Sequence, residues 1–315
     1  MLGKIYGVGA LNLDLIFKVP LDLARNLPYK PGYEYFAQES EARGLLNILE
    51  DQADLQGKYG GGSAANTMVA LSRLGFPCSF MGKVGEDREG DILLESLERV
   101  DKKEIIREGK SGLCITLLLG DSSDRSLVIC PNTNDTFSYE EMPEDKVVSQ
   151  AGWFHFTSFN GDKPFQAQCC LAEDLIPDIT LSLDPGMLYA GRGLKSLLPI
   201  LKSTDYFFPE RKEVEVLTGT SWKEGTRRLI DCGPKVVICT LGEDGVFVVH
   251  KYGEFHVPAL EVPVVDTTGA GDVFVAGFIA SRLKDKSLEE SVQEGVSLAS
   301  KSITGMGRGK YPGSF

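Results

Sequence analysis

Short apolar runs alternate with amphipathic segments along most of this 315-residue chain. The runs that we interpret as strands are residues 4–11, 78–84, 153–157, 179–183, 206–208, 236–240 and 246–250. Helical periodicity marks residues 64–74 and 87–99, and the end of the chain carries an apolar stripe of Leu288, Val292, Leu298 and Ile303. This alternation predicts an α/β fold with a mostly parallel central sheet and helices on both faces. Ligands of such sheets bind at the carboxyl ends of the strands.

Two stretches break the alternation. Residues 20–57 are long and irregular, and the strand-like runs 114–119 and 127–130 flank the polar turn GDSSDR, which predicts a hairpin. Hairpins and long loops added to an α/β core often cover the binding site, so we expect a small β lid drawn from about residues 15–57 and 111–131, with surface decoration as the alternative. No internal repeat or linker interrupts residues 1–315, which we interpret as a single domain.

The charge balance argues against some classes of partner. Lys and Arg number 33 and Asp and Glu number 45, a formal net charge of −12. Such a surface repels nucleic acid and anionic membranes at long range, and no apolar run is long enough to span a bilayer. The seven cysteines contain no CxxC pair and there are three histidines, so we expect reduced thiols, no zinc site and a cytoplasmic protein. A monomer or a homodimer is expected.

The segment DTTGAGD, residues 266–272, carries the strongest chemical signal. The run VFVAGFIA that follows it is apolar on all sides and predicts a buried helix. Backbone N–H groups at Gly269, Ala270 and Gly271, next to the positive end of this helix, would form an anion hole for a phosphoryl group. Asp272 at its edge can act as a general base. The alternative is that Asp272 only caps the helix and the glycines only form a turn.

A second glycine-rich segment, GGGSAAN, covers residues 60–66 and leads into a helix. Its glycines allow a ligand to approach the backbone closely. Asn66 offers both a donor and an acceptor to a polyol. Alone, this segment would be interpreted as a structural loop.

Together the two segments resemble the paired signatures of the ribokinase-like (PfkB) carbohydrate kinases. The similarity continues through GALNLD, GKVGEDREG, LDPG and CTLGEDGVFV, which resemble further ordered segments of that family over nearly the whole chain.

The resemblance implies a role for each matching residue. Asn12, Asp14, Gly62, Ser63 and Asn66 would bind hydroxyls of the acceptor, and an Asp after a strand is otherwise a turn former. Thr240, Gly242 and Gly245 would contact ATP. Gly269, Ala270 and Gly271 would form the anion hole, with Asp272 as the base. Asp266 and Thr268 match positions that bind a monovalent cation such as K⁺ in some relatives, where a C-terminal loop, residues 304–307 here, would supply other ligands.

One segment departs from the family. Where relatives have Asn-x-x-Glu, this chain has Glu210 and Glu213 in FFPERKE. Glu213 would help to place Mg²⁺ through water, because Mg²⁺ retains several waters. Glu210 would then add a negative charge beside the triphosphate, which would either bind the metal more directly or weaken nucleotide binding. The alternative is that Glu210 faces solvent in a charged stretch.

The resemblance implies ATP-dependent transfer of a phosphoryl group to a hydroxyl, a primary one, of a sugar or sugar-like polyol. A nucleoside kinase is the alternative, since the insertion before GGGSAAN is similar to that of adenosine kinases and Phe159 could stack on a base. Phe159 could equally be a core residue. A catalytically silent sugar or nucleoside sensor on the same fold would have lost the base or the anion hole, and both are present. The sequence contains no GxxxxGK[ST] string, which would have indicated a different nucleotide-binding fold.

Overall fold

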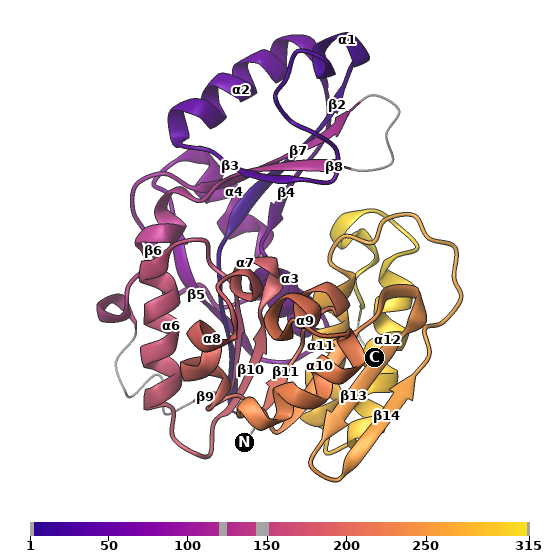
Figure 1. The fold of residues 1–315 in the computed structure, drawn as a ribbon. Helices are drawn as coiled ribbons and strands as arrows, with labels where there is room; N and C mark the ends of the chain where they lie inside the picture. Colours follow the sequence, from indigo (N-terminus) through magenta and orange to yellow (C-terminus); the bar gives the residue numbers. More distant parts are fainter. Residues whose placement is uncertain (1–2, 120–124, 143–150, 314–315) are drawn as a thin grey trace.

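A computed structural model describes residues 3–119, 125–142 and 151–313. Its centre is a nine-stranded sheet in the order β14-β13-β12-β11-β10-β9-β1-β5-β6, drawn in Figure 1. All neighbours are parallel except β13, which runs antiparallel to both β12 and β14. The strands are β1 (Lys4–Val8), β5 (Cys78–Val84), β6 (Ile105–Arg107), β9 (Ala151–Thr157), β10 (Thr180–Asp184), β11 (Tyr206–Phe207), β12 (Val236–Thr240), β13 (Val246–His250) and β14 (Gly253–Val257).

Two hydrophobic clusters lie on the two faces of this sheet. The first contains Ile5, Ile238 and Val248 together with the helices α3 (Ser63–Arg73), α11 (Ala270–Arg282) and α12 (Leu288–Ser302). The second contains the adjacent residues of the same strands, such as Val237 and Val249, whose side chains point to the opposite face of the sheet. It packs against α6 (Asp162–Asp174), α7 (Gly186–Gly191), α8 (Leu194–Leu201), α9 (Arg211–Thr218) and α10 (Trp222–Leu229). The predicted mostly parallel sheet with helices on both faces is confirmed.

A second, five-stranded sheet stands over one end of the large sheet (Figure 1). Its order is β3-β8-β7-β2-β4, with β2 (Asn12–Val19), β3 (Glu34–Phe36), β4 (Asp54–Gly61), β7 (Gly112–Leu119) and β8 (Arg125–Cys130). The helix α2 (Glu39–Gln52) buries Leu45, Leu46 and Leu49 and covers the outer face of this small sheet, while the four-residue α1 (Leu21–Ala24) and α4 (Arg88–Ser96) flank it. The expected hairpin is β7–β8, although most of its turn lies outside the described residues.

The chain passes from one sheet to the other within the run that we interpreted as a single strand, residues 4–11. Pairing in the large sheet ends at Val8, and pairing in the small sheet begins at Asn12. Residues 9–11 lie between the two strands. The sequence is apolar on both sides of this segment because β1 and β2 are each buried on at least one face. The apolar run therefore hides a boundary between two sheets.

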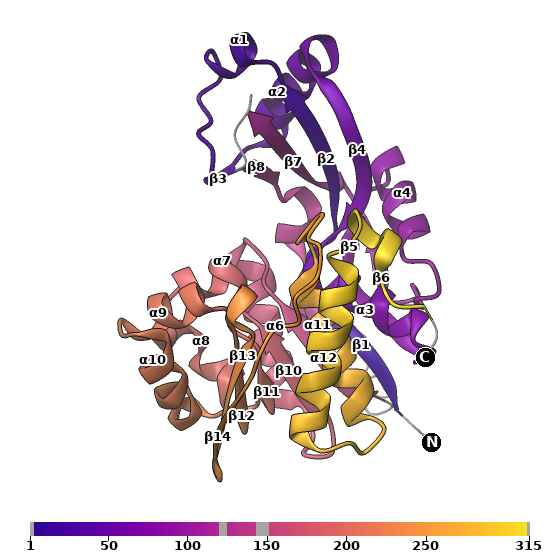
Figure 2. The ribbon, with the colours of Figure 1, turned by 90° about the vertical axis from the view of Figure 1, so that its right-hand side faces the viewer.

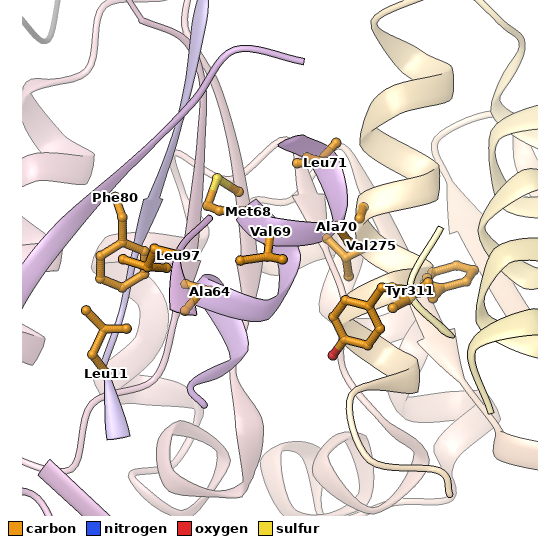
Figure 3. Packing of buried hydrophobic residues seen from close by; sticks show 14 of the residues in the cluster. Leu11, Ala64, Met68, Val69, Ala70, Leu71, Phe80, Leu97, Val275 and Tyr311 are labelled. Atoms are coloured by element: carbon orange, nitrogen blue, oxygen red, sulfur yellow. The ribbon is translucent and has the colours of Figure 1, made fainter. Parts of the chain in front are cut away.

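The helices α3 and α11 pack directly against one another on the large sheet. Figure 3 shows Met68 and Val69 of α3 next to Phe80 of β5, and Ala70 next to Val275 of α11. Thr67 Oγ1 of α3 donates to the backbone oxygen of Asp272 in α11 at 3.3 Å. This packing brings the first turns of both helices, which carry the two glycine-rich signatures, to the same place.

Candidate active site

Asp272 lies in the first turn of α11, and its side chain points to the first turn of α3. The N-cap residue Gly269 adopts a left-handed conformation, with φ 77°. A Cβ atom at Gly269 would lie 2.1 Å from Tyr311 Oη, so this position requires glycine. Gly271 is helical and a Cβ there would have no neighbour within 4 Å, so the positive φ of this segment lies at Gly269 and not at Gly271.

The carboxylate of Asp272 is held by side chains from α3. Asn66 Nδ2 donates to Asp272 Oδ2 at 2.7 Å. Burial raises the pKa of Asp272 to about 6, while hydrogen bonds from Asn66 and Ser63 and the charge of Arg308 oppose that rise. A carboxyl group with such a pKa is largely ionised at neutral pH and still basic enough to accept a proton from a hydroxyl group.

Asp14 and Asn12 lie on the first strand of the small sheet, beside the second glycine segment. Asp14 pairs with Tyr59 of β4, and a Cβ at Gly61 would lie 2.1 Å from Asp14 Oδ2, so this glycine makes room for the carboxylate. Burial raises the pKa of Asp14 to about 7, opposed by the charges of Arg308 and Arg125. Asn12 Oδ1 accepts a hydrogen bond from Asn134 Nδ2 at 3.0 Å.

The residues expected to contact ATP follow β12. Thr240 ends that strand, and Gly242 and Gly245 both have positive φ, of 63° and 88°. They form a tight turn in which Leu241 N donates to Gly245 O at 2.8 Å. Thr240 N donates to Pro209 O at 3.0 Å, which places the turn next to Glu210.

Three carboxylates from neighbouring strand ends gather beside Asp272. Glu210 is the N-cap of α9, and its backbone N–H donates to Glu213 Oε2 at 2.8 Å in a reciprocal capping box. Asp184 ends β10. Burial, followed by the charges of its neighbours, raises the pKa of Asp184 well above its usual range, and burial raises that of Glu213. The sequence interpretation missed Asp184 as a member of this cluster, although the LDPG motif marked its turn.

This donor set fits Mg²⁺ held through water. The carboxylate oxygens are hard ligands, and a divalent cation would relieve their mutual repulsion. Within the described residues no group of three or more acidic, His or Cys side chains encloses a metal ion directly. Water molecules between the ion and Glu210, Glu213 and Asp184 would satisfy both observations.

Asp266 and Thr268 lie in the loop before α11. Asp266 Oδ1 accepts from Thr268 N at 2.9 Å, and Oδ2 accepts from Gly307 N at 3.1 Å. Arg125, the first residue of β8, donates to Thr268 Oγ1 at 2.7 Å. The C-terminal loop therefore lies beside Asp266, and the guanidinium group of Arg125 contacts Thr268, the other residue expected to bind a monovalent cation.

The family model described as pfkB family carbohydrate kinase matches residues 43–311. The chain belongs to the pfkB family. An uncharacterized sugar kinase of Archaeoglobus fulgidus is 38% identical over 241 residues, 75% of this chain and 94% of that protein. The aminoimidazole riboside kinase of Salmonella typhimurium is 30% identical over 265 residues, 74% of this chain and 77% of that enzyme. Among solved structures, adenosine kinase from Sinorhizobium meliloti superposes with a TM-score of 0.84 at 22% identity, covering 98% of this chain and 95% of that one.

As a pfkB kinase, the protein is an ATP-dependent phosphotransferase with a ribokinase-like fold. No helix in the described part of the chain is long and apolar enough to cross a membrane. The cysteines are all free.

Two arginines of this pfkB protein were missed by the sequence interpretation. Arg308 Nε donates to Asn66 Oδ1 at 2.9 Å, and Arg308 Nη1 donates to Ser96 O at 2.9 Å. Arg125 reaches Thr268 from the small sheet. Their partners are 143 or more residues away in the sequence, so only the fold reveals these contacts.

Phe159 is not available to stack on a base. Its side chain is fully buried and stacks on Phe137, with ring centroids 6.0 Å apart. It belongs to the core on the α6–α10 face of the sheet. Of the two alternatives for Phe159, stacking on a base or packing in the core, the structure supports the second.

Proposed function

We propose that this kinase transfers the γ-phosphoryl group of MgATP to a hydroxyl of a furanose that carries a planar aromatic base, as a nucleoside does. The proposal rests on the register of the small sheet around Asp14. Residues that pair directly across strands share a face of the sheet. One row across all five strands therefore contains Tyr59, Asp14, Cys114, Ile129 and Phe36.

The neighbouring row on the same face places Ile16 and Leu127 on either side of Thr116 and ends at Glu34 on the edge strand. These aliphatic side chains are only partly buried, and neither hydrophobic core of the described chain includes them. Phe36 and Tyr59 are 50% and 44% exposed. Since α2 covers the opposite face, this one is left for a ligand.

The position of Asp14 within this apolar row supports the choice of acceptor. Its carboxylate would accept hydrogen bonds from sugar hydroxyls, and a substituent on the sugar would then lie against Cys114, Ile129 and Phe36. A planar base would bury apolar area there, whereas a free sugar would leave it exposed to water.

The chemical step balances without a covalent enzyme intermediate. Asp272 takes the proton of the acceptor hydroxyl as its oxygen forms a bond to the γ-phosphorus atom. The bond between that phosphorus and the β,γ-bridging oxygen breaks, and ADP leaves. N–H groups of Gly269, Ala270 and Gly271 would stabilise the transferring phosphoryl group. Mg²⁺ bound near Glu210, Glu213 and Asp184 would supply positive charge to the phosphate oxygens.

A free sugar is the second candidate acceptor. Asp14, Ser63 and Asn66 together offer acceptors and donors suited to a polyol. With such a substrate the small sheet would close over the sugar alone.

The test is a comparison of acceptors under one ADP-coupled assay. Adenosine, inosine, cytidine and uridine would be offered beside ribose, fructose and a sugar acid. We expect the kcat/KM of at least one nucleoside to exceed that of ribose by about tenfold or more, the equivalent of roughly 1.4 kcal/mol.

Matched variants make the comparison specific to the small sheet. Phe36→Ser should lower kcat/KM for the nucleoside and leave that for ribose unchanged. Tyr252→Ser, at an 82% exposed site in the β13–β14 turn, should change neither. Turnover of free sugars with no preference for nucleosides would reject the first candidate in favour of the second.

A further inference from the structure

Arg308 lies in the short 3-10 helix η5 (Gly307–Lys310), near the end of the chain, where it contacts α3 and α4. Its Nε donates to Asn66 Oδ1, and Asn66 Nδ2 donates in turn to Asp272 Oδ2, at 2.9 and 2.7 Å. An amide side chain with a donor partner at its oxygen can present its NH₂ group in only one direction. The contact with Arg308 therefore orients Asn66 toward the base.

The rest of the guanidinium group is held in place. Nη1 donates to Ser96 O at 2.9 Å, and Nη2 is buried with no hydrogen-bond partner in the described structure. A buried donor without a partner is costly, as is a buried charge, unless nearby opposite charge compensates. The carboxylates of Asp14, Asp272 and Glu98 are the nearby negative charges that favour the charged form of the buried Arg308.

We propose that Arg308 is a positioning residue for phosphoryl transfer, which orients Asn66 against Asp272 and supplies the positive charge that balances Asp14 and Asp272. The inference depends on the role proposed above for Asp272.

Several negative charges surround Asp272, and Arg308 supplies the positive charge that opposes their effect on the pKa of Asp272. Asp14 on β2, Asp184 at the end of β10 and Glu210 at the start of α9 all contribute negative charge, and the Tyr311 hydroxyl faces it from the C-terminal segment. Arg308 lowers the pKa of Asp272 against burial and against these carboxylates. Without that charge the pKa of Asp272 would rise, and less of the base would be ionised at a given pH.

The decisive variants are Arg308→Met, which keeps an apolar stem without charge, and Arg308→Lys, which keeps the charge. In Arg308→Met the acidic limb of the kcat/KM profile should move to higher pH by roughly 1 unit, the lower end of the shift expected from an opposite charge nearby. At a pH below both limbs this corresponds to about a tenfold loss of rate. Arg308→Lys should keep the limb within a few tenths of a unit and lose kcat, because one ammonium group cannot make both hydrogen bonds.

Arg73→Met is the matched control. Arg73 Nη1 donates to the backbone oxygen of Arg308 at 2.6 Å and Arg73 pairs with Glu98, so it secures the same C-terminal segment from a position that does not contact Asn66 or Asp272. If Arg308 only anchors the segment, Arg73→Met and Arg308→Met would lower stability alike and neither would move the acidic limb. That result would overturn the proposal.

Three further measurements keep the outcome unambiguous. Circular dichroism and thermal unfolding establish that each variant is folded, and Arg308→Gln, neutral but polar, replaces Arg308→Met if the latter does not fold; it should give the same shift. An Asp14→Asn background separates the two carboxylates, since a shift caused by Asp272 persists there and one caused only by Asp14 disappears and rejects the proposal. Full activity of Asp272→Asn would instead refute the proposed role of Asp272 as the base, whereas the acceptor comparison tests the proposed substrate class independently.

Discussion

Arg125 Nη1 donates a 2.7 Å hydrogen bond to Thr268 Oγ1, joining two residues that lie 143 positions apart in the sequence. Arg125 begins β8 of the small sheet, and Thr268 precedes the N-terminus of α11. The contact ties the small sheet to the loop that carries the anion hole. It spans the region that holds Asp14 on one side and Asp272 on the other.

Loss of this tie should weaken acceptor binding more than turnover. In Arg125→Met we expect KM for the acceptor to rise by roughly 3–10-fold, or about 0.7–1.4 kcal/mol, which is the usual net contribution of one hydrogen bond. ATP hydrolysis in the absence of acceptor should increase, because water would be excluded less well. Arg25→Met, at a 77% exposed side chain next to α1, is the control. Unchanged KM and hydrolysis would show that the contact has no kinetic role.

Replacing the base should abolish most turnover without unfolding the protein. Asp272→Asn keeps a polar partner for Asn66, and we expect kcat to fall by roughly 10²–10⁴. ATP affinity, measured separately by calorimetry, should stay within a few fold. Asp285→Asn, at an exposed turn position with φ 58°, should have no effect on kcat. Near-normal turnover by Asp272→Asn would remove Asp272 from the mechanism.

Alanine substitutions at Gly269 and Gly271, the two glycines of the proposed anion hole, should differ in their effect on stability. Gly269→Ala forces a left-handed φ on alanine and a clash with Tyr311, so we expect a loss of about 1–3 kcal/mol of unfolding free energy in denaturant titrations. Gly271→Ala meets open space in a helical conformation and should leave stability nearly unchanged. If phosphate oxygens approach the Gly271 backbone, Gly271→Ala will still lower kcat. Equal stability of the two variants would contradict the structural assignment.

Glu210 should affect the metal requirement. Glu210→Asn preserves a good N-cap for α9 but removes one charge beside Glu213. We expect the Mg²⁺ concentration for half-maximal rate to rise severalfold, with thermal stability retained. Glu215→Gln, on the same helix and exposed, is the comparison. An identical Mg²⁺ curve for Glu210→Asn and the wild-type protein would mean that Glu210 serves only as a cap.

Metal binding to the carboxylate cluster should strengthen as pH rises. The folded-state pKa values of Asp184 and Glu213 are raised, so these groups stabilise the fold below the unfolded pKa, and this contribution is lost as pH rises through the folded pKa. Mg²⁺ binds the ionised forms and displaces the protons. Thermal stabilisation by Mg²⁺ should therefore be larger at pH 8 than at pH 5.5, and smaller in Glu213→Gln at pH 8. A stabilisation independent of pH would exclude these carboxylates as the site.

Local patterns predicted most strands of the large sheet and the helices that carry the signatures, but not the edge strands β6 and β14. Strands 78–84, 236–240 and 246–250 have the expected bounds, because each is rich in apolar residues and is buried on both faces. The helix after Asp272 was predictable because it is apolar on all sides, and it is indeed buried almost throughout. Glycines with positive φ, such as Gly242 and Gly245, also lie where the motifs placed turns.

Contacts across the fold were not predictable from the sequence. Nothing in GRGKY shows that Arg308 lies beside Asn66, because the two residues are 242 positions apart. The change of sheet between Val8 and Asn12 leaves no mark in an apolar run. Phe159 looked available because its strand ends near the site, whereas the direction of its side chain depends on the packing of Phe137.

The direct continuation of β1 into β2 also affects where Asp14 lies relative to the large sheet. Because β1 belongs to the large sheet and β2 to the small one, any tilt of the small sheet about residues 9–11 moves Asp14 relative to Asp272. Binding of the acceptor by Asp14 and the distance between Asp14 and Asp272 would then change together. An acceptor that binds more tightly when Asp14 lies nearer to Asp272 would shift the protein toward that arrangement, so a substitution within residues 9–11 should change acceptor affinity.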